Sequence, residues 1–268
     1  MFQITIPFLY IIAGVAFAMT RLSRFSERSG ALLITAFIVG LAGLIWHFLV
    51  LLDLILMPNG IALSLSSTAS FIGLQLALIA IIGAIEPSLR GMAGGLLLLG
   101  AAAATVTGLQ GVEITAEPRS WQLQAHILIA LFAYGLLTVG AIVAVYALIQ
   151  ERRLHAGKLS TVNQLFAPLE TTERLLFGIA GAGFSVLLIA VLLGFTFVDD
   201  PFAQHLAHKM FLSLLALLLF GILIAGRQFA GWRGRRAVFL YLWGFAILCL
   251  AYFGSRYILE EVLGRSWG

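Results

Sequence analysis

The chain has 268 residues, of which 61% are hydrophobic and only 10% are charged. A soluble domain of this length could not bury so much apolar surface, so most of the solvent around the chain must be lipid. The formal net charge of +4 reflects 16 basic and 12 acidic residues, and a single cysteine excludes an intrachain disulfide or a cysteine-rich metal cage. The composition predicts an integral membrane protein.

Eight apolar segments are long enough to cross about 30 Å of hydrocarbon, which takes about 20 residues in a helix. They are predicted to be helices because a segment in lipid must satisfy its own backbone hydrogen bonds. The first segment lacks a basic region and a small-residue cleavage site, so we expect a membrane span and not a removed signal peptide. The expected fold is an all-α integral membrane protein, with residues 1–268 forming one bundle of eight spans at 3–20, 31–52, 62–85, 92–109, 122–149, 173–197, 207–226 and 237–258.

Lysine and arginine are distributed unequally between the two sides of the predicted bundle. Twelve of them lie in alternate loops and four on the opposite side, the twelve falling within residues 21–30, 86–91, 150–174 and 227–236. The positive-inside rule places these loops in the cytoplasm and both termini on the non-cytoplasmic side. The run GWRGRR is therefore interpreted as a topology anchor, and we expect the lipid bilayer as partner and no nucleic acid.

Four of the five histidines fall near the outer ends of predicted spans. His47 and His126 lie within spans, whereas His205 and His208 lead into the seventh span one helical turn apart, and His155 lies in a cytoplasmic loop. Ionisable side chains within a membrane are costly unless they are paired, ligated or facing a cavity. A neutral imidazole is satisfied by a hydrogen bond, so each histidine is either a structural residue or a ligand.

Histidines from several spans are expected at a similar depth in the membrane. Such a group of imidazoles suits two kinds of metal site. Zinc accepts three histidines with an open fourth position. Haem iron accepts two axial histidines, and its apolar ring suits a pocket between helices lined by aromatic residues such as Trp121. The haem propionates need cations, and Lys209, Arg119 and Arg256 are the basic residues expected near the outer end. Haem is preferred because no outer carboxylate stands out as a fourth zinc ligand.

Several stretches of the chain resemble the cytochrome c assembly family of membrane proteins, and within it the eight-span branch called YpjD-like or HemX-like. The likeness covers most of the chain and is clearest from His126 to Ile258. The residues that carry it are AHILIALFAYGLLTVGAIVAVYALIQERRL, PLETTERLLFGIAGAGF, HKMFLSLLALLLFGILIAGRQFAGWRGRRAVFLYLWGF and LAYFGSRYI.

The resemblance implies a specific set of haem ligands. In haem-handling members of this family, two outer histidines flank a WWD motif and ligate haem. By position, His126 and His208 resemble these axial ligands of a non-covalent haem b, and His47 resembles a histidine within the membrane. The chain has no WWD motif and only Trp121 in the corresponding loops. Transfer of haem to an apocytochrome is therefore left open.

The sequence favours a non-enzymatic, haem-binding membrane protein that assists cytochrome c assembly or haem handling, with haem and other assembly proteins as partners. The alternative is a scaffold or regulatory subunit that stabilises a larger complex or a haem-biosynthesis enzyme without carrying haem. A transporter is disfavoured because the polar residues expected near the midplane are uncharged, namely Gln75, Thr105 and Thr138. A metallohydrolase is disfavoured because the chain lacks HExxH.

Overall fold

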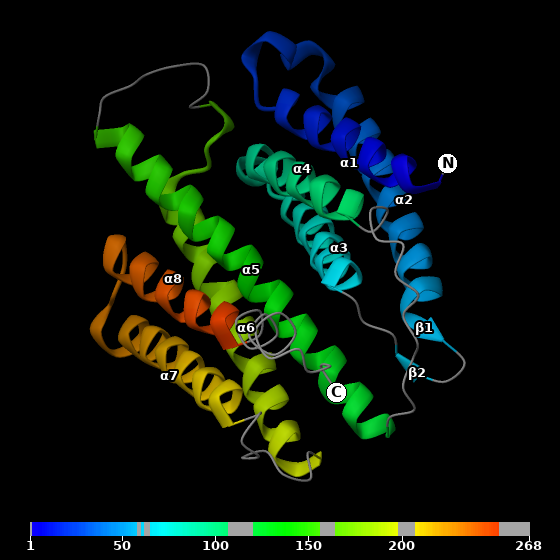
Figure 1. Ribbon diagram of the computed structural model, residues 1–268. Coiled ribbons are helices and arrows are strands. Elements are labelled where there is room, and N and C mark those ends of the chain that lie inside the picture. The colour runs from blue at the N-terminus through cyan, green and yellow to red at the C-terminus, as the bar shows by residue number, and fades with distance from the viewer. Residues whose placement is uncertain are drawn as a thin grey trace. The chain divides into compact units, whose positions relative to one another are not determined.

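The computed structural model describes residues 2–57, 60–61, 65–106, 120–155, 164–197 and 207–251. The chain divides into two compact units, which we call unit 1 and unit 2 (Figure 1). Unit 1 comprises Met1–Ser120 and Gln150–Thr172, and unit 2 comprises Trp121–Ile149 and Glu173–Gly268. The expectation of one bundle over residues 1–268 stays a prediction.

Unit 1 is built on four α-helices: α1 (Phe2–Met19), α2 (Ser29–Ile55), α3 (Leu65–Gly83) and α4 (Arg90–Val106). Helix α1 packs against α2 and α4, and α3 packs against α4 and α2. Two short 3-10 helices, η1 (Ser23–Arg28) and η2 (Pro87–Leu89), precede α2 and α4. After α2, the short strand β1 (Leu56–Met57) pairs in antiparallel fashion with β2 (Gly60–Ile61).

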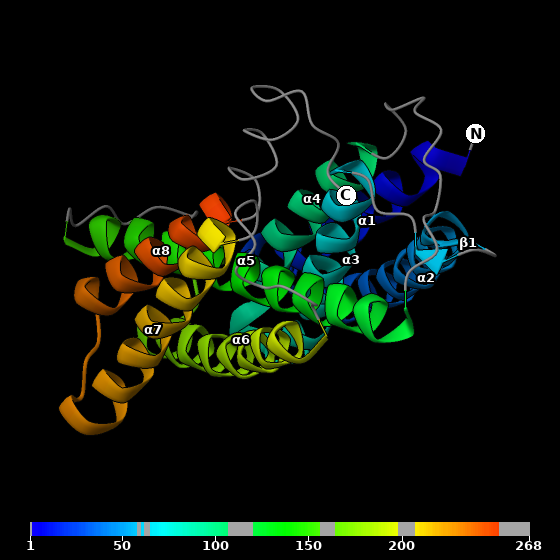
Figure 2. The ribbon, with the colours of Figure 1, turned by 60° about the horizontal axis from the view of Figure 1, so that its bottom comes forward.

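Unit 2 contains most of α5 (Trp121–His155) and α6 (Leu169–Phe197), followed by α7 (Ala207–Ala230) and α8 (Arg235–Cys249). Helices α7 and α8 lie side by side in Figures 1 and 2. The turn between them uses Gly231 and Gly234 at φ of 62° and 64°, where residues with a side chain are strained. The Gly234 backbone N–H donates to Glu173 Oε1 at 2.8 Å, which fastens this turn to the start of α6.

Each of the eight segments expected from the sequence contains an α-helix in the described part of the chain. Six helical stretches of the described residues are long and apolar enough to cross a membrane, and two of them include the 3-10 helices η1 and η2. The apolar stretch Ile4–Met19 of α1 is shorter, and α8 is given as Arg235–Cys249. An all-α membrane protein is thus confirmed, apart from the two-residue strands β1 and β2. Eight complete spans and outer termini stay predictions.

The outward faces of the helices are as apolar as a lipid environment requires. Ile38 of α2, Phe211 of α7 and Trp243 of α8 are each more than 60% exposed. In water such large exposed apolar side chains on successive helices would be unfavourable, whereas in hydrocarbon they cost nothing. The exposed surface therefore agrees with the composition.

Small residues bring the backbones of α1 and α4 close together. A Cβ atom placed on Gly14 would lie 2.9 Å from Gly94 O, and one placed on Gly94 would lie 2.6 Å from Gly14 O. Lipid is as apolar as leucine, so helices in a membrane associate through such close contacts and not through the hydrophobic effect. This explains why the sequence of α4 is rich in glycine and alanine.

Replacing Gly94 with alanine should destabilise unit 1, because α1 and α4 must separate to accept the new methyl group. We expect a loss of about 1–3 kcal/mol in the free energy of unfolding, as for other overpacked sites. The matched control is Gly95→Ala, since a Cβ atom at Gly95 meets nothing within 4 Å. Denaturant unfolding in detergent would compare the two, and equal stability of both variants would contradict the close contact.

Candidate functional site

His126 is the histidine whose surroundings most resemble a metal ligand. It lies in the second turn of α5, is half-buried, and its Nδ1 lies 3.0 Å from the main-chain oxygen of Ala190 in α6. A carbonyl oxygen only accepts, so Nδ1 must carry the proton and donate it. In the neutral ring Nε2 then carries the lone pair, and the described residues provide no hydrogen-bond partner for it.

Gly194 of α6 gives the ring access to that carbonyl. In an α-helix the oxygen of Ala190 also accepts from the N–H of residue 194, so the imidazole shares the acceptor with the helix. A Cβ atom placed on Gly194 would lie only 3.1 Å from His126 Cε1. The missing side chain at Gly194 thus leaves the space in which the His126 ring lies.

This arrangement is the one that metal-bound histidines use. A ligating imidazole donates its second ring N–H to a carbonyl or carboxylate, which fixes the tautomer and aims the other nitrogen at the metal. The bond from His126 Nδ1 to Ala190 O leaves the lone pair on Nε2. A side chain held in this way has the donor atom that haem iron would need.

Lys209, near the start of α7, lies within electrostatic range of the His126 ring. His208 precedes Lys209 in α7, and its side chain lies outside the described part. Trp121 opens α5 and is 72% exposed, on a different helical face from His126. The structure thus places Lys209 within electrostatic range of His126, and Trp121 on another face of α5.

His47 of α2 lies in unit 1 and is engaged through both ring nitrogens. Nδ1 lies 3.0 Å from the Tyr10 hydroxyl of α1, and Nε2 lies 2.8 Å from Ser70 Oγ of α3. The side chain is only 1% exposed. His47 therefore joins three helices as a structural residue in this arrangement, and ligation of a metal would require the loss of one of these bonds. Its role as a cofactor ligand stays a prediction.

Other predicted site residues fall outside the described part of the chain. These are Arg256, Arg119 and His205. Among the described residues, no group of three or more His, Cys, Asp and Glu side chains could hold a metal ion. The three-histidine zinc alternative gains no support from this part of the chain.

Sequence reasoning found the histidines and missed the residues that decide their roles. Tyr10 and Ser70 look like ordinary span residues, and Gly194 looks like one more small residue on α6. The spacing of Ala190 and Gly194, four apart on one face of a helix, is the only signal in the sequence, and many membrane helices share it.

One protein-family model matches nearly the whole chain. The model of the cytochrome C assembly protein family matches residues 7–263. The chain belongs to this family, and it is a multi-pass protein of the inner membrane.

Individual relatives are similar to parts of the chain. Inner membrane protein YpjD of Escherichia coli is 34% identical over 51% of this chain and 52% of its own length. Cytochrome c biogenesis protein CcsA of Guillardia theta is 22% identical over 58% of this chain and 56% of its own length. The chain thus spans about half the length of the curated relatives it matches. No solved structure matches the chain.

Replacing Ser70 with alanine should destabilise unit 1, because His47 Nε2 would lose its partner where no water can replace it. We expect a loss of about 1–3 kcal/mol in the free energy of unfolding. Ser185→Ala is the matched control, since Ser185 is exposed and bonds only to Gly181 O of its own helix. Unfolding of both variants in detergent would test this, and a Ser70 variant as stable as its control would contradict the buried network.

Proposed function

We propose that the protein binds haem b non-covalently through His126 and His208 and assists cytochrome c assembly or haem handling, without being an enzyme. The observation that carries this proposal is the His126 geometry, in which Nδ1 is bound to Ala190 O and Nε2 is left as a ligand atom. Membership of the cytochrome c assembly family supports the same function. The absence of a WWD motif favours holding haem over presenting it to an apocytochrome.

Residues of α5, α6 and α7 would have separate roles in binding haem. His126 would hold the iron through Nε2, and Ala190 O would keep the Nδ1 proton in place so that the ring does not change tautomer. His208 would provide the second imidazole, and Lys209 would neutralise a propionate. When bound, haem would supply one-electron chemistry whose potential depends on these ligands.

We further infer that all eight helices span the membrane with both termini outside. The twelve basic residues in alternate loops support this orientation. It places the starts of α5 and α7 at the outer face, where cytochromes c are assembled in bacteria. Arg256 and Trp121 would then lie at the same face, as the sequence predicts.

Absorption spectra provide the direct test of haem binding. Protein purified in mild detergent from haem-supplemented cells should show a Soret band and, after dithionite reduction, the sharp α and β bands of a low-spin bis-histidine haem. His126→Ala and His208→Ala should each lose or shift these bands. His155→Ala is the control, because His155 is exposed and bonds to Glu151 O in its own helix.

A featureless spectrum in well-folded protein would overturn the haem proposal. The histidines would then be packing residues, and the scaffold or regulatory function would take its place. Bands that persist in both variants would show that haem is bound, but that His126 and His208 are not its ligands.

The glycine that makes room for His126 gives a second test. Valine at position 194 should push the ring off the Ala190 carbonyl and lower haem occupancy about tenfold, since overpacking costs about 1–3 kcal/mol. Gly181→Val lies on the same helix, and a Cβ atom there meets nothing within 4 Å. The Soret absorbance per mole of folded protein would be compared, and equal occupancy in the two variants would contradict the positioning role of Gly194.

A further inference from the structure

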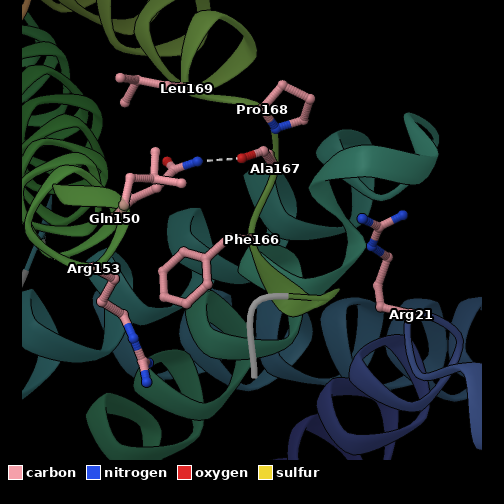
Figure 3. A pocket seen from close by; sticks show the side chains of 8 residues that line it. Arg21, Gln150, Arg153, Phe166, Ala167, Pro168 and Leu169 are labelled. Atoms are coloured by element: carbon pink, nitrogen blue, oxygen red, sulfur yellow. Dashed lines mark hydrogen bonds between the residues drawn. The ribbon is translucent and has the colours of Figure 1, made fainter. Parts of the chain in front are cut away.

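A cavity of about 400 Å³ lies in unit 1, and no histidine is among its described lining residues (Figure 3). It is lined by Arg21 after α1, by the end of α5, by the first residue of α6 and by part of residues 164–168, which we call the lead-in segment of α6. Its lining includes Arg21, Gln150, Arg153, Phe166, Ala167 and Leu169. No role proposed so far uses these residues.

The lead-in segment is fixed at its first residues by contacts with other helices. Arg21 Nε donates to the Gln164 main-chain oxygen at 3.1 Å, and the Ser23 N–H donates to Gln164 Oε1 at 3.0 Å. The next residue, Leu165, lies so close to Gly91 that a Cβ atom there would overlap the Leu165 carbonyl. One wall of the cavity is therefore held in place before any ligand arrives.

A buried glutamine fixes the other end of the lead-in segment. Gln150 of α5 is 5% exposed, and its Nε2 donates to the main-chain oxygen of Ala167. Its Oε1 accepts from Thr172 Oγ1 of α6 at 3.2 Å (Figure 3 shows the first of these bonds). Both ends of the segment are thus tied to helices, so the cavity is preformed.

The lining of the cavity carries positive charge without a compensating acid. Arg21 and Arg153 are both half-buried, and the described residues that line the cavity include no carboxylate. The Arg153 guanidinium lies 5.8 Å from the centre of the Phe166 ring, which supports it from one side (Figure 3). Partly desolvated charges of one sign are unfavourable unless an anion joins them.

We propose that this cavity binds an anionic ligand whose phosphate group is attracted by the charges of Arg21 and Arg153, which lie on opposite sides of Phe166 in Figure 3. The planar guanidinium forms paired hydrogen bonds with phosphate, which makes arginine the residue best suited to it. The apolar lining of Phe166, Leu169 and Leu154 suits the glycerol and acyl parts of a phospholipid. Basic pockets between membrane helices on the cytoplasmic side bind such headgroups. A soluble phosphate is the second source of the same chemistry.

Native mass spectrometry of the full chain in detergent would measure binding of phosphatidylglycerol, with phosphatidylcholine as the zwitterionic comparison. We expect preferential binding of phosphatidylglycerol, and about fivefold weaker binding in Arg21→Gln and in Arg153→Gln. The matched controls are Arg24→Gln and Arg152→Gln, which remove exposed neighbouring arginines that do not line the cavity. Calorimetric titration with inorganic phosphate forms the second arm.

The outcomes separate the two sources of phosphate. Loss of phosphatidylglycerol binding in the cavity variants alone assigns the site to a lipid headgroup, and a response to inorganic phosphate alone assigns it to a soluble phosphate. Equal effects in cavity and control variants, or no preference over phosphatidylcholine together with no phosphate binding, would overturn the proposal.

A measurement on the unaltered chain covers the case in which a cavity variant does not fold. Photoactivatable phosphatidylglycerol should label residues 150–155 or 164–169, as read by peptide mass spectrometry. Labelling confined to other segments would reject the site. None of these measurements requires haem, so their result is independent of the proposed function.

Discussion

Water does not reach the hydrocarbon layer, so polar groups within a span depend on partners inside the protein, and both units contain hydrogen bonds of this kind. In unit 1 the Tyr10 hydroxyl and Ser70 Oγ enclose the ring of His47. In unit 2 Tyr134 donates to Leu248 O at 2.9 Å, and Tyr241 donates to Leu137 O at 3.0 Å, so two bonds connect α5 and α8. These polar side chains therefore lie where helices meet.

Glycine provides the space for these polar contacts. A Cβ atom on Gly140 of α5 would overlap the Tyr241 hydroxyl, which donates to a carbonyl three residues earlier on the same helix. At His126 the ring similarly reaches a carbonyl four residues before Gly194. In each case a polar ring approaches a main-chain oxygen beside a residue without a side chain. Hydrogen bonding and close backbone packing are thus satisfied by the same residues in unit 2.

The helices could be predicted well from the sequence, because a long apolar segment is a strong local signal of a membrane helix. The span expected at 31–52 is α2 at Ser29–Ile55, and the one expected at 173–197 is α6 at Leu169–Phe197. The helices extend beyond the predicted spans where polar residues continue the helix past the hydrocarbon, as at the end of α5. The partners of His47 and His126 could not be predicted, because they come from other helices and depend on packing. The cavity at Arg21 was missed for the same reason, since its walls come from three separate segments.

His47 and His126 are the two described histidines within predicted spans. They differ in the chemistry of their hydrogen-bond partners more than in their expected depth in the membrane. The partners of His47 are hydroxyl groups, which both donate and accept, so either tautomer is satisfied and no nitrogen remains for a metal. The partner of His126 is a carbonyl, which only accepts, so the proton is fixed on Nδ1. The described residues then leave the Nε2 lone pair with a defined direction. Two histidines that look equivalent in the sequence thus differ in the tautomers open to them, because one contacts side-chain oxygens and the other contacts the backbone.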